Sequence, residues 1–262
     1  MCLIAWNWQP GGALPLLVLA NRDEFYARPA LALHPWPCGR VLAGQDAQAG
    51  GTWLGLGPGQ VASRQARFAA ITNFREPLLA RNDAPTRGTL VPDFLQSDAS
   101  AADFLTGLRG RAGAYNPFNL LLFDGTALLG FESHSGRTVA LAPGIGAVSN
   151  AGFNTPWPKL QRLTQSLRTH GTASNPDADP EPLLALLGDR AQAPDADLPA
   201  TGIPLALERA LSPLFIQTSD YGTRASSLVR MHRDRAEIIE KTFDARGATG
   251  QRRLAWPLPA TA

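Results

Sequence analysis

The first 25 residues place the tightest limit on the fold, because they read as a β-hairpin that begins at the second residue. Cys2–Trp8 is rich in strand-forming residues, a QPGG turn signal follows, and residues 16–20 form a second apolar run. Counting back across the turn brings Arg22 and Asp23 level with the start of the chain. The sequence therefore predicts that both side chains lie beside Cys2.

The remaining apolar patterns run in the order strands, helices, strands. This order favours an α+β fold over alternating βαβ units. No change of composition and no repeat divides the sequence, so we expect one domain over residues 1–262. The expected strands are 41–44, 52–56, 68–74, 119–123, 127–131, 143–150, 214–216, 226–229 and 237–243. The expected helices are 86–96, 101–108, 158–169 and 181–187, with surface loops at 171–180 and 191–199 and a loose tail from 247 onward.

The composition argues against several classes of function. The formal net charge is only +2, and no basic block carries interleaved aromatic residues, so nucleic-acid binding is not expected. The best apolar run, at 14–20, is too short to span a membrane, and the chain shows no secretory signal. The two cysteines make no disulfide framework. We therefore expect a soluble protein of the reducing cytoplasm.

Cofactor and metal motifs are missing from the sequence. The four histidines are scattered without the spacing of metal ligands. Gly50-Gly51 does not fit a phosphate-binding loop, and neither GxGxxG nor GxxxxGK occurs. We expect no metal and no resident cofactor.

Cys2 is the residue with the clearest chemical potential. A thiol has a pKa of about 8.5 and an α-amine one of about 7.7–8.0, so a free amine on the same residue accepts the thiol proton near neutral pH. Removal of Met1 would therefore give nucleophile and base in one residue, as is known for N-terminal threonine. Methionine is normally trimmed when the next side chain is small. The alternative is a small buried residue of the first strand.

Five further residues are candidates for the groups that such a nucleophile needs. Arg22 favours the thiolate and Asp23 orients the amine, unless the two form only a structural ion pair. Asn73 and Asn150 each end an apolar strand, where a side-chain amide donates to a developing oxyanion or caps a turn. Arg224 precedes another strand and either binds a substrate carboxylate or satisfies backbone carbonyls.

The run ANRDEFYARP at residues 20–29 resembles the signature of the NRDE family, also called transport and Golgi organisation protein 2 homologues. Further blocks in the family's order extend the resemblance along nearly the whole chain. They are MCLIAW at the start, LAGQD at 42–46, AGGTWLG at 49–55, ITNFR at 71–75, YNPFN at 115–119, SN at 149–150 with TPWPK at 155–159, and YGTRASS at 221–227.

This resemblance implies a fold like that of N-terminal-nucleophile (Ntn) hydrolases, an αββα four-layer sandwich of two antiparallel sheets between helices. More distantly, the pattern is similar to choloylglycine hydrolases and related cysteine amidases, although those enzymes place residues between the arginine and the aspartate that are adjacent here. The site residues that the resemblance implies are Cys2, Arg22, Asp23, Asn73, Asn150 and Arg224. Members of the family are linked to lipid metabolism, haem trafficking and Golgi organisation.

Three functions remain open at this point. The first is a cysteine Ntn hydrolase that cleaves an amide or thioester of a small acyl substrate. The second is a non-catalytic carrier of haem or an acyl lipid, with an apolar cleft between the two sheets that some of the six Trp and eleven Phe residues line, and with His34 and Cys38 as a candidate haem-ligand pair. The third is a scaffold of secretory traffic, which the Arg-rich, bacterial-looking composition disfavours.

Overall fold

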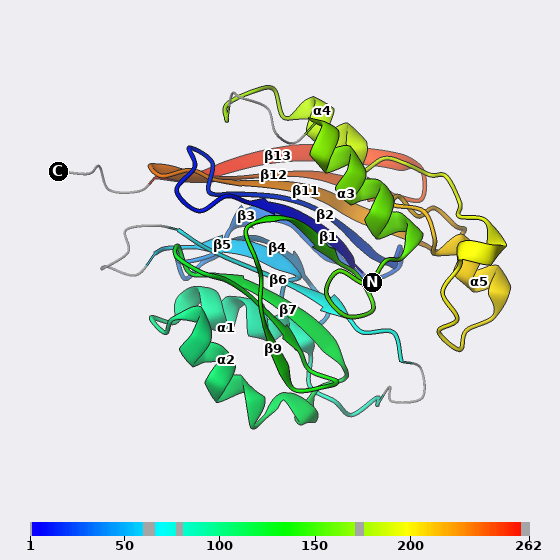
Figure 1. The fold of residues 1–262 in the computed structure, drawn as a ribbon, viewed down its shortest axis with the longest axis horizontal. Coiled ribbons are helices and arrows are strands. Elements are labelled where there is room, and N and C mark those ends of the chain that lie inside the picture. The colour runs from blue at the N-terminus through cyan, green and yellow to red at the C-terminus, as the bar shows by residue number, and fades with distance from the viewer. Residues whose placement is uncertain (1, 60–65, 77–80, 171–175, 258–262) are drawn as a thin grey trace.

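The computed structural model describes residues 2–59, 66–76, 81–170 and 176–257. Two antiparallel sheets lie one above the other, and helices cover the outer face of each (Figure 1). This arrangement confirms the predicted α+β class and the four-layer order of helices, sheet, sheet and helices. No helix in these ranges is long and apolar enough to cross a lipid bilayer.

The six-stranded sheet is built around the N-terminal hairpin. Cys2 lies opposite Arg22 and Trp8 opposite Leu16, so the register agrees with the one predicted from the turn. In spatial order its strands are β10 (Gly144–Val148), β1 (Cys2–Trp8), β2 (Leu16–Phe25), β11 (Tyr221–Met231), β12 (Arg235–Asp244) and β13 (Gly247–Pro257). The two ends of the chain thus contribute neighbouring strands, because β11 pairs directly with β2.

The seven-stranded sheet is a meander in which each strand pairs with the next one along the chain. Its strands are β3 (Ala30–Pro35), β4 (Leu42–Asp46), β5 (Leu54–Gly57), β6 (Arg67–Asn73), β7 (Phe118–Phe123), β8 (Leu128–Glu132) and β9 (Arg137–Ala140). Hydrogen bonding between consecutive strands explains why five of these strands, β4 to β8, could be recognised from short local runs and turns.

Five α-helices occur in the described ranges. α1 (Leu90–Gln96) and α2 (Ala101–Arg109) pack on the seven-stranded sheet, whereas α3 (Pro158–His170) and α4 (Glu181–Leu186) pack on the six-stranded one. α5 (Leu205–Ala210) lies beyond the end of the six-stranded sheet (Figure 1). Three short 3₁₀ turns accompany them: η2 (Arg87–Thr89), η3 (Ala112–Ala114) and η4 (Asp195–Asp197).

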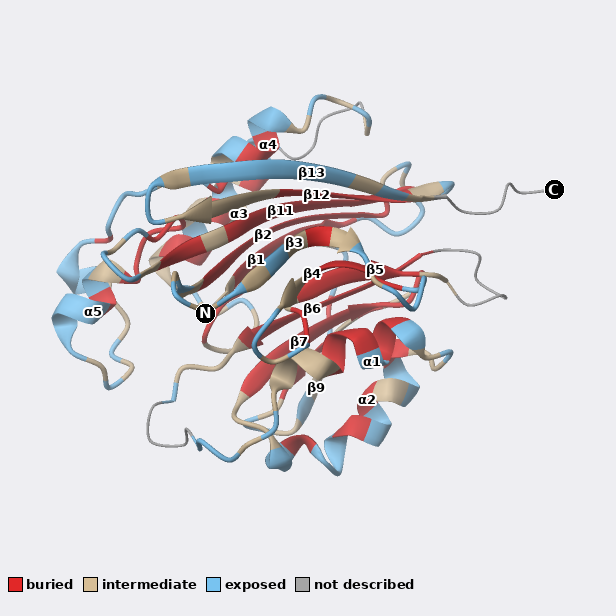
Figure 2. Ribbon diagram, turned by 180° about the vertical axis from the view of Figure 1, so that it is seen from behind, coloured by how far each residue is buried: buried red, intermediate tan, exposed pale blue. Residues whose placement is uncertain are grey.

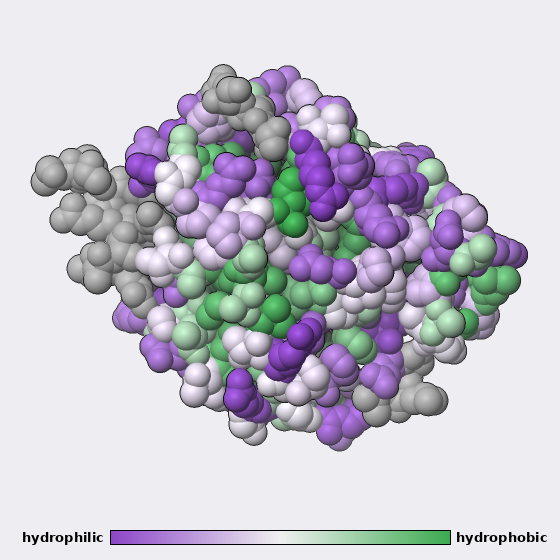
Figure 3. Space-filling model, in the orientation of Figure 1, coloured by the Kyte–Doolittle hydropathy of each residue, from purple (hydrophilic) through white to green (hydrophobic). Residues whose placement is uncertain are grey.

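The alternation of side chains along β1 creates two of the three apolar cores. Ile4 and Trp6 point between the sheets, while Leu3 and Ala5 point toward α3 and α4. A strand buried on both faces reads as a continuous apolar run, which is the pattern of residues 3–6. The buried residues therefore form a band through both sheets and the inner sides of the helices (Figure 2), and the surface mixes polar residues with apolar ones (Figure 3).

Several sequence predictions are wrong. Residues 214–216 are a buried loop, because the amide of Phe215 donates to the carbonyl of Asp189 and that of Ile216 to the side-chain hydroxyl of Thr223, not to the backbone of a strand. The supposedly loose tail forms β13, a polar edge strand that pairs with β12 along its length. The strands β3 and β9 and the helix α5 were not predicted, since each is short and largely exposed.

The remaining predicted strands and helices are present, with ends that shift by a few residues. The predicted loop at 171–180 lies partly outside the described residues.

Candidate functional site

A polar cavity of about 140 Å³ opens where the first strands of the chain end. It brings together four of the six predicted residues: Cys2, Arg22, Asp23 and Asn73. The other lining residues are Glu24, Arg28, Asp46, Gly51, Thr52, Trp53, Ile71, Thr86, Arg87 and Gly88. We call this space the Cys2 cavity.

Strand geometry separates Arg22 from Asp23 although they are adjacent in sequence. In β2, Val18 and Ala20 face the space between the sheets and Leu19 faces the helices. By the same alternation, Arg22 continues the first face and Asp23 the second. The thiol of Cys2 shares the face of its partner Arg22, and Asp23 lies one residue further along β2. The two charged groups therefore flank the start of β1 from opposite sides.

Cys2 is partly exposed at the cavity, and its carbonyl accepts a hydrogen bond of 2.9 Å from Ser149 Oγ. Burial raises the pKa of the Cys2 thiol above its usual value. The charge of Asp23 raises this pKa further and that of Arg22 lowers it. Because the net shift is upward, the thiol is protonated at neutral pH and needs a base before it acts as a nucleophile.

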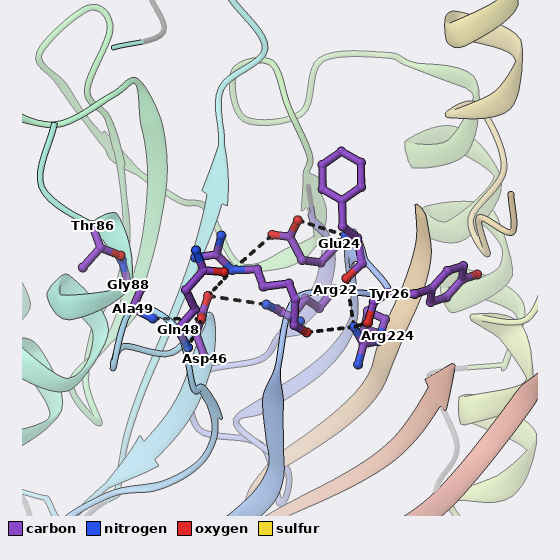
Figure 4. Close-up of polar contacts among 11 residues, drawn as sticks. Arg22, Glu24, Tyr26, Asp46, Gln48, Ala49, Thr86, Gly88 and Arg224 are labelled. Carbon is purple, nitrogen blue, oxygen red and sulfur yellow. Dashed lines mark hydrogen bonds and ion pairs between the residues drawn. The ribbon is translucent and has the colours of Figure 1, made fainter. Parts of the chain in front are cut away.

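Arg22 is held in the cavity wall by an aromatic ring and a carboxylate. Its side chain is 5% exposed, and its guanidinium carbon lies 4.5 Å from the ring centre of Trp53. Its Nη2 lies 3.6 Å from Asp46 Oδ2, and Figure 4 shows the two side chains facing each other. Nη1 is buried without a hydrogen-bond partner among the described residues. Leaving a buried N–H donor unpaired costs stability. The Arg22 guanidinium therefore carries, beside the Cys2 thiol, a positive charge that other groups of the protein do not fully neutralise.

Asp23 is buried and accepts a hydrogen bond of 2.7 Å from Thr223 Oγ1. Burial raises the pKa of its carboxyl group, while the charge of Lys159 and the hydroxyl of Thr223 act in the opposite direction. Lys159 is also buried, at the start of α3, and desolvation lowers its pKa to about 8 despite the charge of Asp23. The Asp23 carboxylate, which would orient an amine at Cys2, thus has the buried ammonium group of Lys159 in its surroundings.

The two asparagines meet each other, but only one of them lines the cavity. Asn73 ends β6, and its amide group makes no hydrogen bond within the described part of the chain. Asn150 Nδ2 donates to the carbonyl of Asn73 at 2.8 Å, and Ser149 Oγ donates to Asn150 Oδ1 at 3.1 Å. Asn73 is thus available as a donor at the cavity, and Asn150 fixes the end of β6.

Arg224 lies away from the Cys2 cavity and satisfies backbone carbonyls, as one of the two sequence interpretations expected. Its Nη1 donates to the carbonyls of Phe25, Tyr26 and Arg28 at 2.9–3.1 Å (Figure 4). Its Nε donates to the carbonyl of Phe243 at 3.1 Å. These bonds hold the chain that follows β2 against β11. Arg224 lines a second cavity, on the other side of Arg22 and Trp53.

Asn21, the first residue of the NRD triplet, is structural. Its Nδ2 donates to the carbonyls of Leu187 and Leu214 at 3.0 and 2.8 Å, and its Oδ1 accepts from Ser226 Oγ at 2.6 Å. The side chain is 1% exposed and its polar atoms are occupied, so Asn21 ties β2 to the chain that packs on the outer face of its sheet.

Sequence reasoning missed Arg87 and Lys159. Arg87 reaches the cavity because the backbone at Gly51 approaches Gly88 so closely that a side chain would not fit: a Cβ on Gly51 would lie 2.4 Å from the Gly88 carbonyl carbon. In the sequence, only the Gly50-Gly51 pair indicated that the backbone at Gly51 comes close to another segment. Lys159 is one of two lysines in a chain whose other basic residues are arginines, and that rarity was its signal.

Comparisons with known proteins found relatives that match most of the chain. A family model described as "Transport and Golgi organisation 2" matches residues 1–245. A Bos taurus protein named "Transport and Golgi organization protein 2 homolog" is 35% identical over 276 residues, which cover 98% of this chain and 96% of that protein. A Mus musculus relative of similar name is 30% identical, with 87% and 88% covered. A Homo sapiens relative is 29% identical, with 89% and 90% covered.

Proposed function

The chain belongs to the transport and Golgi organisation 2 family, also called the NRDE family, and we propose that it is a cysteine hydrolase with an N-terminal nucleophile. Its substrate is a small acyl amide or thioester. The observation that carries this proposal is the pairing of Cys2 with Arg22 at the mouth of a polar cavity that Asp23 and Asn73 also line. Nucleophile, cation, carboxylate and amide donor come from three different strands that meet at one end of the sandwich.

The reaction begins once Met1 has been removed and Cys2 carries a free amine. The thiol proton passes to this amine, which Asp23 orients, and Arg22 stabilises the thiolate. The sulfur then attacks the substrate carbonyl carbon, and the carbonyl oxygen takes the negative charge. The amide of Asn73 donates to this oxyanion. Asn150 acts as a positioning residue, because its contact is with the carbonyl of Asn73.

Two bond cleavages complete the cycle. The tetrahedral intermediate collapses, the bond to the leaving nitrogen or sulfur breaks, and the ammonium of Cys2 returns its proton to the leaving group. Water then attacks the acyl-cysteine thioester, with the amine of Cys2 accepting the water proton. The carboxylic acid product leaves, and the free thiol is restored. Every proton in this scheme is held by Cys2, by the substrate or by water.

The two cysteines of the chain provide a matched test. Cys2 lines the cavity, whereas Cys38 is exposed and is not among the lining residues. We expect p-nitrophenyl acetate to transfer one acetyl group to the processed wild-type protein and to Cys38→Ala, as measured by intact mass, and none to Cys2→Ala. Acetylation of Cys2→Ala to the same extent as wild type would refute the proposal.

A carrier of an acyl lipid is the second candidate function, and one surface feature favours it. A groove of about 510 Å³ runs between β10 and α3, within the range typical of small-molecule sites. Apolar residues such as Ile145 and Leu160 line it together with polar ones. Titration with an acyl-CoA or with haemin, on wild type and on the groove-filling variant Thr164→Trp, tests this function. Binding that Thr164→Trp does not weaken would argue against the groove.

A further inference from the structure

The second cavity, of about 190 Å³, lies between the two sheets and shares only Arg22 and Trp53 with the Cys2 cavity. Its floor carries Glu240, on the face of β12 that points toward the other sheet. The remaining lining residues are Ala30, Leu31, Ala32, Arg224, Ala225, Thr242, Phe243, Asp244 and Thr249. We call this space the Glu240 cavity.

Glu240 has a buried carboxyl group, and only one of its two oxygens accepts a hydrogen bond from a described residue. The side chain is 2% exposed, and Oε1 accepts a hydrogen bond of 2.7 Å from the backbone N–H of Leu33. Oε2 makes no hydrogen bond with any described residue. Oε2 belongs to a buried side chain but is itself open to the cavity, so a donor from outside the protein can pair with it.

Arg224 offers the complementary group on the same cavity. Its Nη1 and Nε are used by backbone carbonyls, but its Nη2 has no hydrogen-bond partner within the described ranges. The lining contains two arginines, Arg22 and Arg224, and two acids, Glu240 and Asp244. Arg22 is 3.6 Å from Asp46 and Asp244 is 3.3 Å from Arg246, which leaves Glu240 and Arg224 to meet a ligand. A ligand with only a positive charge would be repelled by both arginines, and a ligand with only a negative charge would be repelled by both carboxylates. Neither kind of ligand matches this lining by itself.

We propose that the Glu240 cavity binds a small zwitterion of the amino-acid class, with its ammonium group on Glu240 Oε2 and its carboxylate on Arg224 Nη2. The cavity volume lies below the 300–1,000 Å³ range of sites for drug-sized ligands, which restricts the ligand to a few non-hydrogen atoms. Glu240 is buried and Arg224 is partly buried, and a zwitterion supplies a partner to each of these charged groups at once. This site is distinct from the Cys2 cavity and does not depend on the proposed hydrolase activity.

Calorimetric titration with glycine, L-alanine and L-serine tests the proposal directly. We expect at least one of them to bind wild type with a Kd below about 1 mM, which corresponds to about −4 kcal/mol. Its N-acetyl derivative and its methyl ester, which each lack one charge, should bind at least about tenfold more weakly. The proposal is wrong if none of the three amino acids binds at about 10 mM, or if the blocked forms bind equally well.

Variants separate this site from the rest of the molecule. Glu240→Gln keeps an acceptor for the Leu33 amide but loses the charge, and Ala32→Leu fills the cavity from the edge strand β3; each should weaken binding at least tenfold. Glu237→Gln on the opposite face of β12 and Cys2→Ala should bind as wild type does. Unchanged binding by both Glu240→Gln and Ala32→Leu would overturn the assignment, whatever the outcome of the hydrolase test.

Discussion

Replacing Glu240 by Gln should remove a large part of the pH dependence of stability. Burial raises the pKa of Glu240 from 4.5 to about 7, against the lowering effects of the Leu33 N–H and of the charges of Arg22 and Arg252. The difference between these two pKa values corresponds to about 3 kcal/mol of free energy, at about 1.36 kcal/mol for each pKa unit. The folded protein therefore holds a proton that the unfolded chain has already released.

The sign of the effect follows from proton linkage. Between pH 4.5 and about 7 the folded state binds more protons at Glu240 than the unfolded state, so this group's contribution to stability is full below pH 4.5 and is lost as the pH rises through about 7. Gln is neutral throughout. The free energy of unfolding of Glu240→Gln, relative to wild type, should therefore increase by about 3 kcal/mol over this range.

Urea unfolding of both proteins at several pH values between about 4.5 and 8 measures this difference, and the other titrating groups cancel because both proteins contain them. Glu237→Gln is the matched control, since Glu237 lies on the other face of β12 and is paired with Arg230 and Arg253. A difference between Glu240→Gln and wild type that stays constant with pH would refute the reasoning.

Three further substitutions test the site and its support. Asn73→Ala should lower kcat on an acyl substrate about 10²–10³-fold with little change in KM, as for the loss of one oxyanion donor; an unchanged kcat would remove Asn73 from the mechanism. Asn21→Ala leaves two buried carbonyls unpaired and should reduce the free energy of unfolding by about 2–4 kcal/mol in urea titrations. Gly44→Ala would place a Cβ 2.4 Å from the Trp53 ring. It should therefore move that ring from Arg22, change the tryptophan fluorescence and lower kcat.

The part of the site that depends on local geometry could be predicted from the sequence. The pairing of Cys2 with Arg22 follows from one turn and two apolar runs, because an antiparallel hairpin fixes which residues lie opposite each other. The separate placement of Asp23 also follows from strand alternation, once the pairing is known. The αββα order came from the resemblance, since strand runs alone do not determine how two sheets pack.

The contributions that depend on distant packing could not be predicted. Arg87 reaches the Cys2 cavity because Gly51, in the loop after β4, contacts Gly88, in the 3₁₀ turn η2. Arg224 and Glu240 meet at one cavity only because the last strands return to pair beside β2. β13 was mistaken for a loose tail because an exposed edge strand lacks the apolar alternation that marks buried strands, and its stability comes from pairing with β12.

The intact mass of the protein purified from its native host tests whether Cys2 can act as an N-terminal nucleophile. We expect this mass to correspond to a chain without Met1, whose first residue is Cys2 with a free amine. Retention of Met1 in the functional protein would rule out the proposed hydrolase mechanism, because the nitrogen of Cys2 would then be part of a peptide bond and could not accept the thiol proton.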